Sequence, residues 1–206
     1  IAFQGEPGAY SDLACRQVFP RRQSLPCETF EDTIAAVRRG RAGLAMLPIE
    51  NSVAGRVADI HHLLPQSNLH IIGEHYQRVN HHLLAVKGAK LSDLKIVRSH
   101  VHALSQCRKM IRALGLKAEV AADTAGSAAE VARRGDKTVA AIASELAAKV
   151  YGLVSLKANI EDAAHNTTRF LVMSPRPKLA KNDGLIVTTF VFRVRNVPAA
   201  LYKALG

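Results

Sequence analysis

Short, mainly apolar segments alternate with helix-forming segments along most of the 206-residue chain, and this alternation limits the fold more than any other feature. The apolar segments lie at 1–3, 43–47, 95–97, 117–121 and 139–142, and each is followed by a pattern typical of an amphipathic helix. Alternating strands and helices are the signature of sheets with helices on both faces. The sequence therefore predicts an α/β fold with mostly parallel sheets.

Two long extended stretches, 69–86 and 160–173, bracket the middle third of the chain. We interpret them as strands that cross between two lobes, with a central cleft between the lobes. The interpretation makes the first lobe discontinuous, about 1–75 plus 162–174, and places the second lobe at about 76–161. Ligands of such sheets bind beyond the carboxyl ends of strands, often where helices begin.

The C-terminal part has a different composition. Residues 175–184 contain two prolines, two lysines and one arginine and are predicted to be a linker. A strand is predicted over 185–194, and Pro198 opens a helix. One strand and half a helix cannot bury a core, so 185–206 is either a fragment of a third unit or part of a structure completed by a partner.

The formal net charge is +11, which raises the question of nucleic acid binding. The basic residues form scattered pairs with apolar residues between them, and aromatic residues make up only 5% of the chain. We therefore favour a basic enzyme that attracts a small anion and expect no nucleic acid partner. No apolar run is long enough for a membrane span, and three widely spaced cysteines fit neither disulfides nor zinc, so a cytoplasmic protein is expected.

Polar side chains collect where predicted strands end. Glu50, Asn51 and Ser52 follow a buried strand and can form an anion cradle, although an ordinary helix cap explains Asn51 or Ser52 equally well. Further along, Ser99 precedes His100 and His102, which could ligate a metal or act as a base. The more common arrangement is a solvated loop with Ser99 as a helix cap. Gln106 lies in a helix predicted over 103–114, either facing the cleft or on the surface.

Two more polar groups need separate explanations. Helix capping is sufficient to explain Asp123 and Thr124. The run Asn166–Phe170 opens a strand, where threonine is common for steric reasons. Its Arg169 can pair with a substrate carboxylate or with a structural Asp or Glu. The adjacent histidine pairs, and a glycine loop without a P-loop lysine, give no reason to expect a metal or an organic cofactor.

Taken in order, these pieces resemble the prephenate dehydratase family of the bacterial type, over roughly residues 1 to 173. The matching motifs share their order and spacing with the family. They are Gly5–Ser11, Pro48–Val57, Ser99-His100 with Ala103–Cys107, Asp123–Ala125, Ala140–Ala143, Tyr151–Leu153 and Asn166–Phe170. The loop Ser99-His100-Val101-His102 departs from the family's Ser-His-Pro-Gln. Residues 185–206 resemble the start of the family's ACT regulatory domain, with Ala199 where that domain usually has glycine.

The resemblance implies a periplasmic-binding-protein-like catalytic unit that converts prephenate to phenylpyruvate with loss of carbon dioxide and water, without cofactor or metal. It implies Thr168 beside the leaving hydroxyl, with Glu50 as an alternative acid. It also implies that the substrate is bound by a set of polar residues: Asn51, Ser52, Ser99, Gln106, Thr167 and Arg169.

The resemblance further implies a homodimer or homotetramer, and phenylalanine as an allosteric ligand where the ACT domain is complete. Two alternatives stay open from the sequence: an arogenate dehydratase, and a non-catalytic module of the same fold that binds a small carboxylate.

Overall fold

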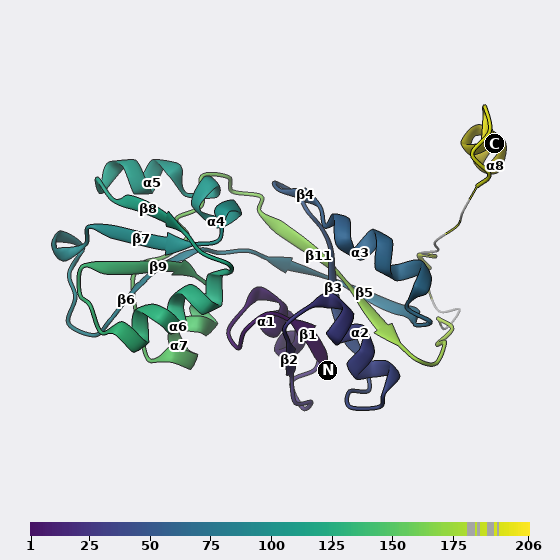
Figure 1. The fold of residues 1–206 in the computed structure, drawn as a ribbon, viewed down its shortest axis with the longest axis horizontal. Helices are drawn as coiled ribbons and strands as arrows, with labels where there is room; N and C mark the ends of the chain where they lie inside the picture. Colours follow the sequence, from purple (N-terminus) through teal and green to yellow (C-terminus); the bar gives the residue numbers. More distant parts are fainter. Residues whose placement is uncertain (181–183, 185, 189–191, 193) are drawn as a thin grey trace.

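The structure, a computed structural model, describes residues 1–180, 184, 186–188, 192 and 194–206. The chain forms two α/β lobes, each built on one sheet, which lie end to end along the long axis of the molecule (Figure 1). The two-lobed α/β class predicted from the alternating pattern is confirmed.

The first lobe contains a sheet with the strand order β2-β1-β3-β11-β5, and β4 pairs with the end of β3. Its strands are β1 (Ala2–Gln4), β2 (Leu25–Cys27), β3 (Ala45–Asn51), β4 (Gly55–Arg56), β5 (His70–Arg78) and β11 (Thr167–Ser174). Its helices are α1 (Tyr10–Val18), α2 (Phe30–Arg38), α3 (Ala58–Leu63) and a 3-10 turn over Leu64–Gln66. Phe3 and Phe170 are buried with Ala14 of α1, whereas Leu47 and Leu171 are buried with helices α2 and α3 on the other face.

The second lobe contains a sheet with the strand order β10-β6-β9-β7-β8. Its strands are β6 (His82–Ala85), β7 (Ile96–Ser99), β8 (Lys117–Val120), β9 (Val139–Ala143) and β10 (Val154–Lys157). Its helices are α4 (Val101–Gln106), α5 (Arg108–Ala113), α6 (Thr124–Arg134), α7 (Glu145–Tyr151) and a 3-10 turn over Leu91–Asp93. Leu104 and Ile111 cover one sheet face, and Val131 and Ala147 the other, so helices cover both faces as predicted.

Both sheets are mixed, so the prediction of mostly parallel sheets is wrong. Strand β1 is parallel to β2 and β3, and β7 is parallel to β8 and β9. However, β11 runs antiparallel to both β3 and β5, and β6 runs antiparallel to both β9 and β10. The reason is the crossing itself, because a strand that arrives from the other lobe runs against the strands beside it. The predicted residue boundaries of the lobes and of the linker stay predictions.

The helix predicted over 103–114 is in fact two helices. The backbone leaves helical geometry at Cys107, which has φ −123° and ψ 26°. The carboxylate of Asp162 accepts hydrogen bonds from the backbone N–H groups of Arg108 and Lys109, at 3.0 and 3.2 Å. A carboxylate from the second crossing segment therefore caps a new helix, α5, and this ends α4 at Gln106.

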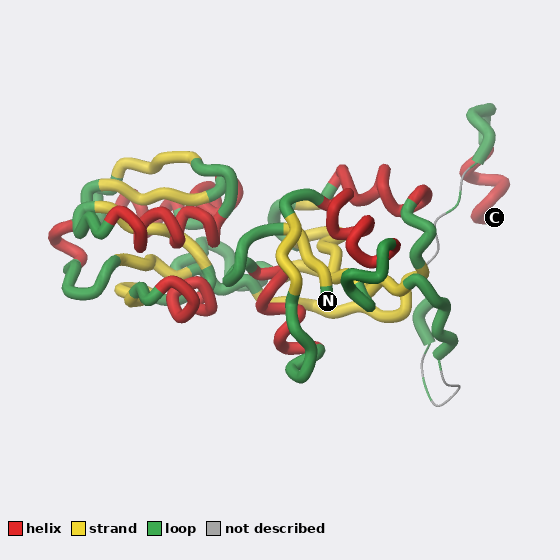
Figure 2. Tube along the Cα trace, turned by 60° about the horizontal axis from the view of Figure 1, so that its bottom comes forward, coloured by secondary structure: helices red, strands yellow, loops and turns green. Residues whose placement is uncertain are grey.

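The C-terminal helix α8 (Ala200–Leu205) lies apart from both lobes (Figure 2), and its Tyr202 is exposed. The helix predicted to open at Pro198 is thus present. The strand predicted over 185–194 lies largely outside the described residues, and the assignment of 185–206 to an ACT domain stays a prediction. Among the described residues, no helix combines the length and hydropathy that a membrane span needs.

A close contact joins the lobes beside the crossing segments. The loop before α1 lies against α7: Ser144 donates a hydrogen bond to the carbonyl of Gly8 at 2.5 Å, and Tyr151 donates to that of Pro7 at 2.8 Å. Gly8 has φ +88°, and a Cβ atom there would lie 2.7 Å from the Cα of Ala147. The lobes can therefore approach this closely only because residue 8 is a glycine and has no side chain.

We expect Gly8→Ala to lower the free energy of unfolding by about 2–4 kcal/mol, because a left-handed backbone and an overlap with α7 both penalise the methyl group. The matched control is Gly40→Ala, since Gly40 also has positive φ (+72°) but open space around it. The control should lose only about 1–2 kcal/mol. Urea unfolding followed by circular dichroism measures both, and equal losses would contradict the proposed contact.

Candidate functional site

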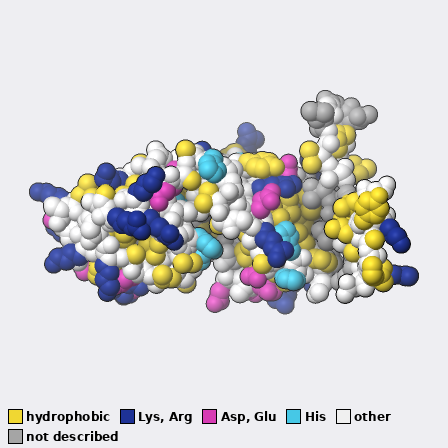
Figure 3. All heavy atoms as spheres, turned by 90° about the horizontal axis from the view of Figure 1, so that it is seen from above, with side chains coloured by type: hydrophobic (Ala, Val, Ile, Leu, Met, Phe, Trp, Pro, Cys, Tyr) yellow, Lys and Arg dark blue, Asp and Glu magenta, His cyan; other side chains and the backbone are white. Residues whose placement is uncertain are grey.

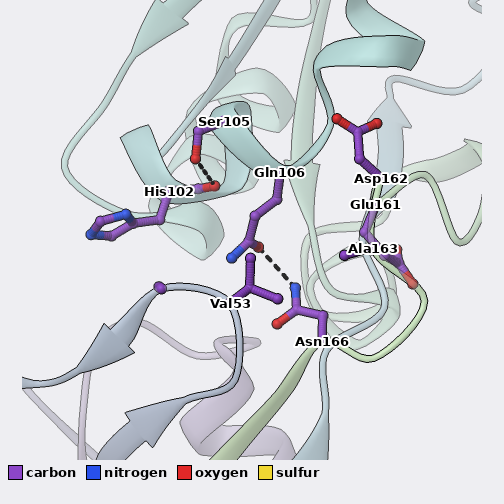
Figure 4. A pocket seen from close by; sticks show the side chains of 9 residues that line it. Val53, His102, Ser105, Gln106, Glu161, Asp162, Ala163 and Asn166 are labelled. Carbon is purple, nitrogen blue, oxygen red and sulfur yellow. Dashed lines mark hydrogen bonds between the residues drawn. The ribbon is translucent and has the colours of Figure 1, made fainter.

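A cavity of about 320 Å³ lies between the lobes (Figure 4). Its wall comes from the β3–β4 turn of the first lobe, from α4 of the second lobe and from the second crossing segment. The wall residues are Val53, Ala54, His102, Ser105, Gln106, Glu161, Asp162, Ala163 and Asn166. We call this space the inter-lobe cavity.

The orientation of the Asn51 amide is fixed by the turn that it belongs to. Its Oδ1 accepts hydrogen bonds from the backbone N–H groups of Val53 and Ala54, at 2.9 and 2.8 Å. The Nδ2 group must therefore point the other way. It donates to Asn166 Oδ1 at 2.8 Å and to Thr168 Oγ1 at 3.0 Å, with the carbonyl of Thr167 at 3.2 Å. An amide with two backbone donors on its oxygen cannot flip without losing both.

Thr168 is consequently a hydrogen-bond acceptor from Asn51. The two residues are paired across β11 and β3, so their side chains lie on the same face of the sheet. Among the described residues, no group accepts the hydroxyl proton of Thr168, so this proton is free for another partner. Neither Thr168 nor Asn51 is part of the cavity wall. Thr168 lies behind the wall, bonded to Asn51, which in turn bonds to the wall residue Asn166.

The hydrogen bonds continue from Asn166 into the second lobe. Asn166 Nδ2 donates to Gln106 Oε1 at 2.8 Å, and the same oxygen lies 2.9 Å from His81 Nε2. On its other side, His81 Nδ1 lies 2.9 Å from the hydroxyl of Tyr10. We call the six residues joined in this way the polar network: Tyr10, His81, Gln106, Asn166, Asn51 and Thr168.

The other face of β11 carries a separate group. Arg169 pairs with Glu50 at 3.1 Å and with Glu74 at 2.7 Å, and its guanidinium lies over the ring of Tyr76. The hydrogen bonds to Glu50 and Glu74 raise the pKa of Arg169. With Thr167, this group lines a second cavity of about 210 Å³. Arg169 thus takes the structural pairing that the sequence left open.

Glu50 lies on the side of the sheet away from Thr168. Asn51 and Glu50 are neighbours in β3, so their side chains alternate between the two faces. The Glu50 side chain is 53% exposed and paired with Arg169. Glu50 therefore faces away from Thr168 and is not among the residues that line the inter-lobe cavity.

Two predicted site serines hold backbone in place. Ser52 Oγ donates to the carbonyl of His165 at 2.6 Å and accepts from the N–H of Thr167 at 3.0 Å. Ser99 is fully buried and donates to the carbonyl of Ile142 at 2.6 Å. Neither hydroxyl faces the inter-lobe cavity. Asp123 accepts from Gly126 N–H at the start of α6, which confirms the prediction of a helix cap.

His81 and Tyr10 were not among the site residues predicted from the sequence. His81 was set aside as one of an adjacent histidine pair without metal-ligand spacing. In the structure it is 2% exposed, and burial lowers its pKa despite the hydrogen bond with Gln106. Burial likewise lowers the pKa of His82 and of His100. Among the described residues, no group of three or more His, Cys, Asp and Glu forms a metal-binding cluster.

Two α/β lobes joined by crossing segments, with a polar cavity between them, define the class of two-lobed, periplasmic-binding-protein-like folds. The family model described as "Prephenate dehydratase" matches residues 1–178. The chain therefore belongs to the prephenate dehydratase family, a family of hydro-lyases of phenylalanine biosynthesis.

Several relatives support this assignment. The chain is 56% identical over its whole length to a bifunctional N-acyl-homoserine lactone acylase/prephenate dehydratase of Komagataeibacter europaeus and covers 74% of that protein. It is 43% identical to the chloroplastic arogenate dehydratase/prephenate dehydratase 1 of Arabidopsis thaliana, but spans only 53% of it. The prephenate dehydratase of Arthrobacter aurescens, solved in complex with L-Phe, superposes with a TM-score of 0.84 at 29% identity, over all of this chain and 71% of that one.

The fixed amide of Asn51 leads to a prediction. We expect Asn51→Asp to lower the free energy of unfolding by about 1–3 kcal/mol, because a carboxylate oxygen would then face the acceptors Asn166 Oδ1 and Thr168 Oγ1. The control is Asn159→Asp, the same change at an exposed position just before the second crossing segment. Chemical denaturation measures both variants, and equal midpoints would show that Asn51 does not have the orientation described.

Proposed function

We propose that this chain converts prephenate to phenylpyruvate and that Thr168 is the hydrogen-bond donor to the departing ring hydroxyl. One observation carries the proposal: Asn51 Nδ2 occupies an acceptor position of the Thr168 hydroxyl, and this leaves the hydroxyl proton for the substrate. Membership of the prephenate dehydratase family supplies the reaction.

The reaction needs little acid strength. The electron pair of the bond to the ring carboxylate moves into the ring as carbon dioxide leaves. The carbon–oxygen bond then breaks, and its pair leaves with the hydroxyl, which takes up a proton and becomes water. Formation of an aromatic ring drives these steps. A hydroxyl that donates a well-placed hydrogen bond to the oxygen as negative charge develops is sufficient to speed departure.

The reaction also requires that the substrate be bound and oriented, and the inter-lobe cavity can provide this. Gln106 Nε2 has no hydrogen-bond partner among the described residues, and Figure 4 shows it at the inter-lobe cavity, where it can donate to substrate oxygen. Closure of the lobes would bring a substrate in the cavity against Asn51 and Thr168 and exclude water. The positive net charge favours capture of a dianion. On the face seen in Figure 3, the Lys and Arg side chains are dispersed over both lobes, which suits a general attraction more than one binding stripe.

Arogenate is the alternative substrate. It carries an ammonium group where prephenate has a ketone, and the inter-lobe cavity includes the carboxylates of Glu161 and Asp162. Both already accept backbone hydrogen bonds, Glu161 from His81 and Asp162 from Arg108. Their charge nevertheless favours an ammonium group, and the plant relative is named for both activities.

Hydrolysis of N-acyl-homoserine lactones is a second candidate function, supported by the name of the relative that is 56% identical. Amide hydrolysis needs an activated nucleophile beside a base. In the inter-lobe cavity, the hydroxyl of Ser105 donates to the carbonyl of His102 at 2.8 Å and is not paired with a base. The geometry of this cavity therefore favours dehydration.

The finer expectations about assembly belong to this proposal. We propose a cytoplasmic homodimer or homotetramer, and phenylalanine as a regulatory ligand when 185–206 is part of a complete ACT domain. The Arthrobacter aurescens relative was solved with L-Phe, which supports phenylalanine as the ligand to test.

Thr168→Ala is expected to lower kcat for prephenate about 10²–10⁴-fold, with a much smaller change in KM, because the lost hydrogen bond acts mainly on the departing hydroxyl. Thr168→Ser should restore most of the rate. The control is Thr138→Ala, a threonine of the second lobe whose hydroxyl bonds to Asp136 and not to the polar network. Phenylpyruvate formation is followed at neutral pH with chelator present, and near-normal turnover of Thr168→Ala would remove Thr168 from the mechanism.

The three candidate substrates can be compared on the same wild-type preparation. We expect kcat/KM for prephenate to exceed that for arogenate, and no measurable release of homoserine lactone from an N-acyl-homoserine lactone. Faster turnover of arogenate would identify the acidic wall as the dominant specificity element. Lactone release that survives in Thr168→Ala would establish a separate acylase site. Saturable binding of prephenate without product would favour the non-catalytic module.

A further inference from the structure

His81 lies at the point where the first crossing segment enters the second lobe, between β5 and β6. It is 2% exposed, and its two ring nitrogens contact different lobes. Nδ1 lies 2.9 Å from Tyr10 of α1, in the first lobe, and Nε2 lies 2.9 Å from Gln106 of α4, in the second. A neutral histidine ring has one nitrogen that donates a hydrogen bond and one that accepts. Which nitrogen of His81 carries the proton therefore decides how it acts on Gln106.

The direction is determined from the far end of the polar network. Asn51 Oδ1 accepts from two backbone N–H groups, so Asn51 Nδ2 donates to Asn166 Oδ1. Asn166 Nδ2 is then the donor to Gln106 Oε1. Because Gln106 Oε1 can only accept, His81 Nε2 must carry a proton and donate to it.

The remaining nitrogen of His81 is set by the Tyr10 hydroxyl. Burial lowers the pKa of His81, so the ring is neutral at neutral pH and Nδ1 is the acceptor. The Tyr10 hydroxyl has one proton and two acceptors within reach, the carbonyl of Asn80 at 2.8 Å and Nδ1 at 2.9 Å. The charged groups facing the ring are few: Glu161 accepts from the backbone N–H of His81, and His82 is its chain neighbour.

We propose that His81 is a positioning residue for the dehydration: its Nε2–H holds the Gln106 amide so that Gln106 Nε2 faces the inter-lobe cavity. This role rests on the proposed function. Gln106 Oε1 receives one hydrogen bond from Asn166 and one from His81, and together these two bonds fix both the position and the rotation of the amide. Without His81, the amide can turn about its single bond with Asn166 and present an oxygen to the substrate.

The polar network also connects the inter-lobe cavity with the contact between the lobes at Gly8. Tyr10 is the first residue of α1, two positions after Gly8, whose carbonyl accepts a hydrogen bond from Ser144 at the start of α7. A substrate donor in the second lobe, Gln106, is therefore oriented by a residue of the crossing segment that is itself oriented by the first lobe. Lobe orientation and donor orientation are coupled through His81.

Three substitutions distinguish the contribution of Nε2 from that of Nδ1. In His81→Gln, the side-chain amide nitrogen reaches the position of Nε2 and can still donate to Gln106. In His81→Asn, the shorter amide reaches only the position of Nδ1, so it retains a partner for Tyr10 and loses Gln106. His81→Leu removes both.

We expect His81→Gln to keep kcat/KM for prephenate within about fivefold of wild type, and His81→Asn and His81→Leu to lose about 10–100-fold, the scale of a misplaced substrate contact. Thermal unfolding of the Gln and Asn variants is measured alongside, since both leave a buried amide in place of the ring. Equal activity of the Gln and Asn variants would overturn the role of His81. An inactive wild type would overturn the proposed function itself, which distinguishes the two failures.

A second measurement uses the wild type alone and does not depend on folding of the variants. In protein with ¹⁵N-labelled histidine, the neutral ring of His81 should show a protonated Nε2 and an unprotonated Nδ1, with the His81→Gln spectrum used for assignment where that variant folds. Where it does not, correlation through the ring to the His81 backbone gives the assignment. A protonated Nδ1 with bare Nε2 would overturn the proposal, because Gln106 Oε1 would then receive no hydrogen bond from His81.

Discussion

The antiparallel pairing of β11 with β3 determines which side chains meet at the site. Thr168 lies opposite Asn51, and Arg169 lies opposite Glu50. Because side chains alternate along a strand, the pair of Thr168 and Asn51 belongs to the polar network on one face. On the other face, Arg169 forms ion pairs with Glu50 and Glu74. A register slip of one residue would exchange the two faces and place a guanidinium against the amide of Asn51.

The same strand also anchors the core, which explains why the register is secure. Phe170, Leu171, Val172 and Met173 are each 4% exposed or less, and they face the two cores of the first lobe alternately. A register shift lies between Arg169 and Phe170, where the polar part of the strand ends and the buried part begins. Burial of these four side chains, worth roughly 1.5–3 kcal/mol each, holds the polar end in place without using its own hydrogen bonds.

The sequence predicted the elements better than their directions. The alternating pattern identified strands β1, β3, β7, β8 and β9, and the residue type identified the cap at Asp123, because those signals are local. The short strands β2 and β4 were missed. It did not predict mixed sheets, since the direction of β11 relative to β3 depends on the path through the other lobe. The break at Cys107 was missed for a similar reason. The carboxylate of Asp162, which caps α5, is 54 residues from Arg108 and 53 residues from Lys109 in the chain. Family motifs brought Asn51, Gln106 and Thr168 to attention, but only three-dimensional contact relates them to His81.

The separation of Glu50 from Thr168 bears on the kind of catalysis that we propose for this site. Glu50 lies on the other face of the sheet, where its exposed carboxylate is paired with Arg169 and does not face Thr168. Thr168 is a far weaker acid, yet its proton is available because Asn51 occupies an acceptor position of its oxygen. An elimination driven by aromatisation needs a donor aimed at the departing oxygen more than it needs acidity. In the proposed mechanism, the backbone N–H groups at the β3–β4 turn fix the amide of Asn51. Asn51 in turn orients Thr168, and through Asn166 it orients Gln106.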